Sequence, residues 1–385
     1  MALNQSILLL AKYHRLPKYY QYHIPSRTVY NRSDPHPQLI YPHYPIIKQG
    51  ESPNIAKESV LIRFYDRIIH HPAFLPVDCV VCMFYPGQCH FFVPFNKTVL
   101  FLPAHRFLIQ RCNRNEVYAL LHAMFAYPDH VMVRAASCYD AEYIQYFTGI
   151  QVPIIYSSSL FAYPEPQYYS PIYDEYLIAP FKYKEIQFYN EITHACKKQG
   201  ISCNLTTVLQ RFGKSWSFQE LYRFKAIIAF PYAVLSYYLN DIFASGTPLF
   251  VPSPQFLIQL DLLHDVRNSD TVYCGKLFTP PSKHHQSNHP YSPEDPSAEA
   301  VLYWLQYASF YTPATIQFDS WDDLAIKLKT TNYTEKFNQR IQENREIKEH
   351  NKKEWKKVMN RIEKNRKLPS SYEEAKMYFN VNSFF

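Results

Sequence analysis

Apolar residues alternate along the chain between short continuous runs and longer stretches with helical periodicity, beginning near residue 58. Short apolar runs bounded by turn residues are typical of buried strands. Strands are predicted at residues 78–85, 98–103, 130–134 and 152–156, and helices at residues 115–127 and 139–148. Ser137 can cap the second helix, and Gly149 ends it. Strands separated by helices predict a parallel sheet covered on both faces.

A second alternation of the same kind follows residue 172. Its predicted strands are at residues 176–180, 225–230, 248–252 and 315–318. Its predicted helices are at residues 184–199, 217–223, 234–244, 254–264, 298–310 and 321–329. A long basic helix is predicted at residues 335–366, before Pro369.

The two alternations predict an α/β fold of two doubly wound, Rossmann-like domains that face a central cleft. A length of 385 residues also exceeds what one hydrophobic core normally serves. The proline-rich residues 161–172 lack apolar periodicity and are predicted to be the linker. The predicted units are a Pro/Tyr-rich arm (1–57), an N-terminal α/β domain (58–160), the linker (161–172), a C-terminal α/β domain (173–330) and a basic helix with a tail (331–385).

Composition removes several classes of protein from consideration. An apolar content of 47% indicates a globular chain, and no apolar run approaches the ~18 residues of a membrane span. With only 7 glycines, the chain has neither G-x-G-x-x-G nor G-x-x-x-x-G-K-[ST], so a dinucleotide-binding or P-loop enzyme is not expected. Cys79 and Cys82 form a CxxC inside an apolar run, and no second CxxC follows at zinc-site spacing.

The net charge indicates which partners the protein could bind, and the N-x-[ST] triplets, which are N-glycosylation sequons, indicate its cellular compartment. The net charge is +7, and residues 335–367 hold 12 Lys/Arg against 6 Asp/Glu. A solvated surface helix explains this segment better than nucleic-acid binding, while contact with an anionic membrane stays open. N-x-[ST] triplets occur at Asn4, Asn31, Asn96, Asn204 and Asn332. They favour the endoplasmic reticulum or Golgi lumen if an N-terminal anchor is missing from this chain; the alternative is the cytoplasm.

Residues 225–231 have the pattern of a buried strand that stops at a proline. Because ligands of open α/β sheets bind beyond the carboxyl ends of strands, the next helix, at residues 234–244, points its N-terminus at a crevice that suits a phosphate. Lys182 and Lys184 are either phosphate contacts or solvated residues at a helix start. Ser236 and Asn240 are either ligand contacts or solvent-facing. The candidate ligand contacts are Lys182, Lys184, Pro231, Tyr232, Ser236 and Asn240.

Residues 240–252, NDIFASGTPLFVP, resemble the E-A-x-A-x-G-x-P segment of GT-B glycosyltransferases, which bind a nucleotide-sugar between two doubly wound domains. Ala244, Gly246 and Pro248 match the segment directly. Asp241 stands where the family has the Glu that hydrogen-bonds the nucleotide ribose. Ala233 stands where retaining members have a second acidic residue, so the resemblance does not imply retaining chemistry. Residues 300–328 also resemble the tail of GT-B donor domains.

The resemblance implies a glycosyltransferase that moves a sugar from a nucleotide-sugar donor to a glycan or another hydroxyl acceptor, carbohydrate or linked to protein or lipid. The chain has no D-x-D, the motif of metal-dependent transferases, so metal-independent chemistry without a cofactor is expected. The alternative is a non-catalytic carbohydrate-binding or scaffold protein derived from such an enzyme. Its main support is Ala233.

Candidate catalytic residues follow two strands of the N-terminal half. His105 can remove a proton from an acceptor hydroxyl, and Arg106 can offset developing phosphate charge; His105 can equally cap a helix. Asp140 lies beside Ser137 where a cleft residue is expected, although helix capping is the favoured role of Ser137. The histidines of residues 284–289 suggest a loop that closes over the donor rather than a metal site.

Overall fold

The structure is a computed structural model of the chain. It describes residues 62, 64–66, 77–83, 89, 91–95, 97–103, 124, 129–157, 168–179, 184–213, 218–260, 288–293, 295 and 297–365. Apart from Met124, the predicted helix at residues 115–127 lies outside these ranges, as does most of the predicted linker. Among the described residues, no helix has the length and apolar composition needed to cross a membrane.

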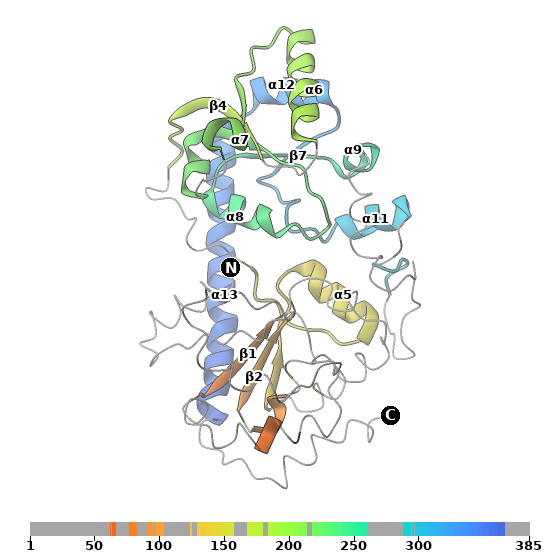
Figure 1. The fold of residues 1–385 in the computed structure, drawn as a ribbon, viewed down its shortest axis with the longest axis vertical. Helices are drawn as coiled ribbons and strands as arrows, with labels where there is room; N and C mark the ends of the chain where they lie inside the picture. Colours follow the sequence, from red (N-terminus) through yellow and green to blue (C-terminus); the bar gives the residue numbers. More distant parts are fainter. Residues whose placement is uncertain are drawn as a thin grey trace.

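The N-terminal unit contains a three-stranded parallel sheet in the order β1-β2-β3 (Figure 1). Its elements are β1 (Cys79–Met83), η2 (Val93–Phe95), β2 (Thr98–Leu102), β3 (Val131–Val133) and α5 (Cys138–Thr148). All five residues of β2 are buried, as a strand covered on both faces requires. The predicted strands at residues 78–85, 98–103 and 130–134 are therefore confirmed, with bounds that differ by one or two residues.

The predicted strand at residues 152–156 forms only an isolated bridge, between Ala135 and Ile154. Ile155 donates its N–H to the carbonyl of Ala135 at 2.8 Å, so pairing with the sheet begins. The N–H of Tyr156 then donates to Oδ1 of Asn351, 195 positions away, at 2.9 Å. A side chain thus bonds to Tyr156, while backbone bonding to the segment after β3 occurs on either side of it: the N–H of Ala135 donates to the carbonyl of Pro153, and the N–H of Ser157 donates to the carbonyl of Ala136, each at 2.9 Å.

The second unit is built on a five-stranded parallel sheet in the order β5-β4-β6-β7-β8. Its strands are β4 (Tyr173–Ile178), β5 (Leu205–Thr207), β6 (Phe224–Ile228), β7 (Leu249–Pro252) and β8 (Ile316–Phe318). Its helices are α6 (Glu185–Lys198), α7 (Val208–Phe212), η4 (Phe218–Arg223), α8 (Tyr237–Ser245), α9 (Pro254–Gln259), α11 (Ala298–Leu305) and α12 (Trp321–Thr330). The α/β class with parallel, Rossmann-like sheets is confirmed.

Four predicted helices differ from the observed elements, and the first of them is α9, which ends at Gln259 rather than at residue 264. The segment at residues 217–223 is the 3-10 helix η4 rather than an α-helix. Helix α11 ends at Leu305 rather than at residue 310, because the next N–H groups bond to carbonyls three residues back. Helix α8 begins at Tyr237 rather than at residue 234, because the hydroxyl of Ser236 closes a turn with Ala233.

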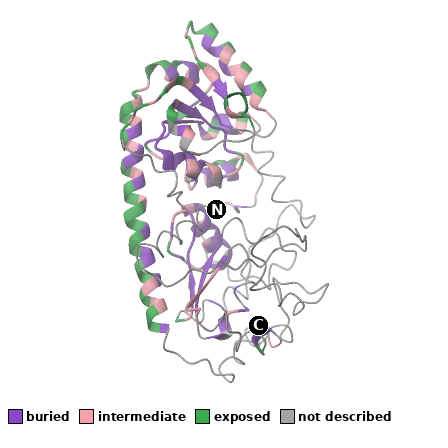
Figure 2. Cartoon of the chain, turned by 60° about the vertical axis from the view of Figure 1, so that its left-hand side comes forward, coloured by how far each residue is buried: buried purple, intermediate pink, exposed green. Residues whose placement is uncertain are grey.

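The long C-terminal helix α13 (Tyr333–Asn365) runs beside both units, as Figures 1 and 2 show. Its polar face is exposed, and the buried residues of its opposite face lie in two stretches, Phe337 to Asn344 and Asn351 to Asn365 (Figure 2). Trp355 and Val358 pack against Leu100 and Leu102 of β2, covering one face of the first sheet. The prediction of a solvated surface helix is thus correct for one face of α13 only.

The buried stripe of α13 contains asparagines that bond to backbone groups of both units. Asn344 donates to the carbonyl of Phe243 at the end of α8, at 2.9 Å. Asn351 donates to the carbonyl of Tyr156 at 2.9 Å and accepts from its N–H. Asn365 donates to the carbonyl of Asp129, at 2.6 Å, and to the side-chain Oγ1 of Thr98 at the start of β2, at 3.1 Å. These amides satisfy backbone groups that no strand reaches.

One buried apolar cluster extends through both units, from Cys82 in β1 to Leu328 in α12. The contact between the units is largely aromatic. The ring of Tyr139 in α5 lies edge-on to Trp304 in α11, with centroids 5.8 Å apart, and Tyr146 does the same at 6.1 Å. The two sheets therefore share a continuous core.

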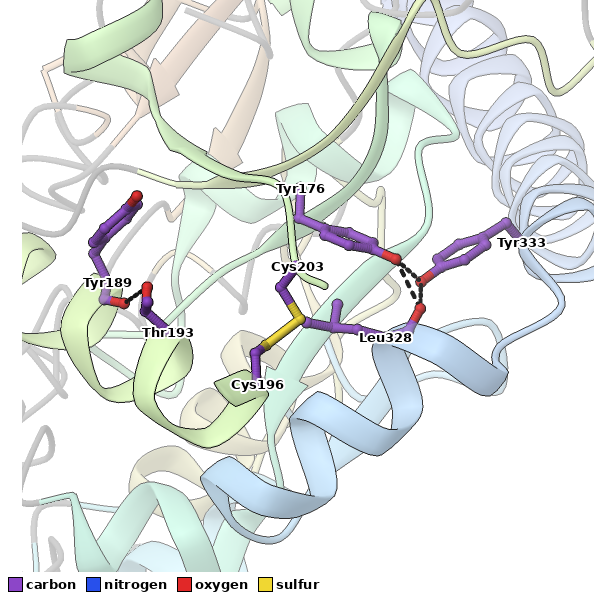
Figure 3. Close-up of a disulfide and its surroundings, with 7 residues drawn as sticks. All are labelled: Tyr176, Tyr189, Thr193, Cys196, Cys203, Leu328 and Tyr333. Carbon is purple, nitrogen blue, oxygen red and sulfur yellow. Dashed lines mark hydrogen bonds between the residues drawn. A yellow bond between two sulfur atoms is a disulfide. The ribbon is translucent and has the colours of Figure 1, made fainter. Parts of the chain in front are cut away.

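A disulfide between Cys196 and Cys203 joins the end of α6 to the segment before β5. Figure 3 shows it in the same close-up as the hydrogen bonds that fix the start of α13. Tyr176 of β4 and Tyr333 of α13 both donate to the carbonyl of Leu328. The remaining described cysteines, at 79, 82, 89 and 138, are thiols.

Candidate functional site

The order of the five-stranded sheet reverses between β4 and β6. In chain order the strands are arranged 2-1-3-4-5, so the crossovers from β4 and from β6 leave in opposite directions. Ligands of open α/β sheets bind in the crevice that such a reversal opens at the carboxyl ends of the strands. The two strands are paired up to this edge, where the N–H of Ala179 donates to the carbonyl of Ile228 at 2.9 Å. This edge is the candidate site.

The loop from β6 to α8 presents an aromatic ring at this edge. Pro231 is buried, whereas Tyr232 is 42% exposed. The ring of Tyr232 stacks on Tyr238, with an interplanar angle of 13° and centroids 5.8 Å apart. Tyr238 is fixed in turn by donating its hydroxyl to the carbonyl of Phe230 at 2.8 Å. The exposed ring is therefore held in place before any ligand arrives.

Ser236 and Asn240 are both buried, so the solvent-facing alternative is wrong for each. The Ser236 hydroxyl donates to the carbonyl of Ala233 at 2.8 Å and accepts from its N–H at 3.2 Å. Oδ1 of Asn240 accepts from the hydroxyl of Ser309 at 3.3 Å. These bonds shape the start of α8 and attach it to the segment after α11. A ligand contact by either side chain stays a prediction.

Asp241 lies in the second turn of α8 and is half-buried. Desolvation of its carboxylate raises the pKa of Asp241 to about 6. A carboxyl group with such a perturbed pKa beside a candidate site is a functional candidate, because burial without complete compensation costs stability. Above pH 6 its carboxylate is a strong acceptor for hydroxyl groups.

Gly246, which like Pro248 matches the resembling segment, has a structural explanation. Gly246 ends α8 in the left-handed conformation, with φ of 79°. A Cβ at this position would lie 2.9 Å from both Cδ1 of Ile341 and Cε2 of Phe337 in α13. The main-chain carbonyl of Pro248, directly before β7, accepts a hydrogen bond from the N–H of Ile227 at 2.9 Å. Close packing of α13 therefore accounts for Gly246 without a ligand, whereas the bond at Pro248 is made by a main-chain carbonyl and would be available to any residue.

Lys184 occupies the N-cap position of α6, directly after the segment that leaves the carboxyl end of β4. Its side chain makes no capping hydrogen bond and is half-buried. The position suits a cation facing an anionic ligand, although a phosphate contact stays a prediction. Lys182, the other predicted phosphate contact, lies outside the described residues.

Of the three predicted catalytic residues, the structure describes only Asp140. Asp140 is buried in the first turn of α5, where its carboxylate accepts from the hydroxyl of Ser137 at 2.8 Å. The N–H of Asp140 donates back to Oγ of Ser137 at 3.0 Å, which confirms Ser137 as the helix cap. A catalytic role for Asp140 stays a prediction. His105 and Arg106 lie outside the described residues.

A polar link between the units was missed at the sequence level. The imidazole of His289 lies 2.9 Å from Oε2 of Glu142 in α5 and 2.7 Å from the hydroxyl of Tyr303 in α11. In the neutral imidazole, Nε2 carries the proton, because a carboxylate only accepts, and Nδ1 accepts from Tyr303. This bonding holds residue 289 between α5 and α11. His284 and His285, from the same predicted loop, lie outside the described residues.

No local sequence pattern predicts the hydrogen bond between Glu142 and His289, because the two residues are 147 positions apart. Within the described ranges, no group of three or more His, Cys, Asp and Glu side chains is arranged to hold a metal ion. The structure brings Pro231 and Tyr232 to the same sheet edge as Lys184, with Asp241 one turn into the adjoining helix.

The chain matches no protein-family model, no curated protein and no solved structure.

Proposed function

We propose that the chain is a glycosyltransferase that transfers a sugar from a nucleotide-sugar donor to a hydroxyl group of an acceptor. The observation that carries the proposal is the reversal of strand order between β4 and β6, with α8 beginning at the same carboxyl edge. A helix N-terminus at such an edge offers free N–H groups and the positive end of the helix dipole. A donor diphosphate has the complementary charge.

The residues around this edge support separate parts of the donor. The exposed, stacked ring of Tyr232 offers a flat apolar surface for a nucleotide base. Lys184 supplies a positive charge toward the diphosphate. The half-buried carboxylate of Asp241 suits paired hydroxyls, such as those of a ribose. His105 and Arg106 remain the proposed groups for activating the acceptor, and Asp140 is the alternative from α5. Neither a metal ion nor a cofactor is part of this proposal.

A non-catalytic sugar-binding or scaffold protein is the second candidate, and the turn at residues 233–236 favours it. Ala233 replaces the acidic residue of retaining enzymes, and both its backbone N–H and carbonyl are bonded to Ser236. Transfer chemistry separates the candidates. An enzyme slowly hydrolyses its donor without an acceptor, whereas a binding protein binds the same donor and leaves it intact.

Thermal shift against UDP-, GDP-, ADP- and CMP-sugars identifies the donor, because a ligand that binds only the folded state raises the melting temperature. Calorimetric titration of that donor into Asp241→Ala is expected to show binding weaker by roughly 10- to 100-fold, the loss of about 1.5–3 kcal/mol for hydrogen bonds to a charged group. Asp174→Asn is the matched control, since Asp174 is an exposed carboxylate at the amino end of β4. Equal donor affinity in wild type and Asp241→Ala would reject the assigned ribose contact.

A further inference from the structure

Two of the five N-x-[ST] triplets lie in the described part of the chain, and both place their asparagine at the surface. Asn204 begins Asn-Leu-Thr directly before β5, and Asn332 begins Asn-Tyr-Thr directly before α13. Both side chains are exposed. Exposure of the asparagine at both positions meets the first requirement for a modified site.

Both asparagines lie at the amino edge of the five-stranded sheet. The carbonyl of Asn204 accepts from Tyr176 in β4 at 2.8 Å, and its side chain donates to the carbonyl of Asp174 at 3.1 Å. Tyr333, next to Asn332, lies under the ammonium group of Lys225 near the start of β6. The candidate donor site is at the opposite, carboxyl edge. A bulky group on either asparagine therefore leaves that site open.

The disulfide provides independent evidence on the compartment. Cys203, bonded to Cys196, immediately precedes Asn204 (Figure 3). Disulfides persist in oxidising compartments and are rare where glutathione keeps thiols reduced. N-linked glycans are attached in the same oxidising, secretory environment. The bonded cysteines and the exposed sequons therefore indicate one environment.

We propose that Asn204 and Asn332 are N-glycosylation sites, and this inference does not depend on the proposed enzymatic function. The co-reactant is an oligosaccharide carried on a polyprenyl diphosphate. A bond forms between Nδ2 and the anomeric carbon, the bond from that carbon to the diphosphate oxygen breaks, and the diphosphate leaves with the electron pair. Nδ2 gives up one proton to a base of the transferring enzyme.

The hydrogen bonds of the two asparagines are compatible with a glycan. Glycosylated Nδ2 keeps one N–H, so Asn204 can still donate to the carbonyl of Asp174. Oδ1 is unchanged, so Asn332 can still accept from the N–H of Glu335, at 3.2 Å, and cap α13. The modification therefore costs neither residue its structural role.

The test uses the full chain purified from the cells that make it naturally. Peptide N-glycosidase in heavy-oxygen water converts each glycosylated asparagine into labelled aspartate, which peptide mass spectrometry locates. Label is expected at Asn204 and Asn332, and alkylation without reductant is expected to leave Cys196 and Cys203 unmodified. Unlabelled asparagine at both positions, or freely alkylated Cys196 and Cys203, would overturn the proposal; an unlabelled asparagine at one position would exclude that site.

Variants made in the same cells provide a second readout. Asn204→Gln and Asn332→Gln are each expected to lose one glycan, seen as one step in gel mobility that the glycosidase abolishes. Thr334→Ala destroys the second triplet while keeping the Asn332 cap, so it tests that site even if Asn332→Gln folds poorly. Asn360→Gln, at an exposed asparagine of α13 outside any triplet, is the matched control and is expected to migrate as wild type.

Discussion

At the scale of single residues, the segment of residues 240–252 separates into two kinds of position. Gly246 is explained by the packing of α13 against the end of α8. Asp241 differs from Gly246, because burial of its carboxylate raises its pKa and so opposes folding. Asp241, whose burial is unfavourable for folding, is therefore a stronger functional candidate than Gly246.

Gly246→Ala is expected to destabilise the fold by about 1–3 kcal/mol, since the new Cβ would be strained at a positive φ and would collide with Ile341 and Phe337. Gly200→Ala is the matched control: its φ is 63°, but nothing lies within 4 Å of the added Cβ. Urea denaturation measures both. Equal losses for the two variants would show that contact with α13 contributes nothing at Gly246.

Asp241 makes stability depend on pH in a defined direction. Its folded pKa of about 6 lies above the ordinary value of 3.8, so the folded state binds more protons between these values and stability falls as pH rises through this window. The cost is complete above pH 6 and absent below pH 4. Allowing for solvent screening of a partly exposed group, it amounts to about 1–2 kcal/mol.

Asp241→Asn is therefore expected to gain about 1–2 kcal/mol over wild type at pH 7.5, with the gain shrinking toward pH 4. Denaturant unfolding of both proteins across this range measures the difference. Asp174→Asn, at an exposed carboxylate, is expected to show no comparable gain at pH 7.5. A stability difference between Asp241→Asn and wild type that is constant with pH would contradict the proposed desolvation.

At the scale of elements, α13 combines an exposed charged face with a buried stripe that repeats every three or four residues. The stripe contains Phe337, Ile341, Asn344, Asn351, Trp355, Val358 and Asn365. Asparagines at such positions favour the interpretation of a fully solvated helix when the sequence is considered alone. Their amides are nevertheless buried and bonded to backbone groups of other elements.

Asn351→Leu is expected to cost about 2–4 kcal/mol, because the N–H and carbonyl of Tyr156 both lose their partner. Asn360→Leu, on the exposed face of the same helix, should change stability by less than about 0.5 kcal/mol. Hydrogen exchange at the Tyr156 amide gives the local readout. Unchanged protection there in Asn351→Leu would show that the bond contributes little.

At the scale of the whole molecule, α13 and the aromatic contacts between α5 and α11 connect the two sheets into one body. The helix bonds to the second unit as far as Asn344 and to the first unit from His350 onward, where the imidazole of His350 bonds to the carbonyl of Ile154 at 2.9 Å. The residues of α13 between Asn344 and His350 therefore couple the unfolding of one unit to the unfolding of the other.

Glu346→Pro breaks the helix between the two sets of contacts, at a cost of about 3 kcal/mol or more. The two units are expected to unfold separately, giving two calorimetric transitions where wild type gives one. Glu346→Ala, at the same exposed position, keeps the helix and should keep the single transition. If Glu346→Pro lowered the melting temperature but kept one transition, the shared aromatic core would suffice for coupling.

Much of the secondary structure could be predicted from local signals. Ser137 and Gly149 bracket α5 as expected, Ser320 caps α12, and the apolar runs became strands of parallel sheets. The predicted secondary structure was less accurate where a side chain from a distant part of the sequence bonds to the backbone. The segment at residues 152–156 forms only an isolated bridge, and the N–H and carbonyl of Tyr156 bond to the side chain of Asn351. The candidate site was predictable only in outline: a strand ending at Pro231 indicates its edge, whereas the burial of Ser236 and Asn240 is invisible in the sequence.

The sequence by itself determined the α/β class, the position of most helices and strands, and a helix that begins beyond Pro231, after strand β6. Capping residues and apolar runs act over a few positions, so their effects can be deduced locally. Only the tertiary structure decided the strand order that marks the candidate site, the partners of α13, and the link between His289 and Glu142. Each of these depends on contacts between residues far apart in the chain, and those contacts leave no local pattern. The desolvation of Asp241 belongs with them, because it is set by the elements that pack around α8.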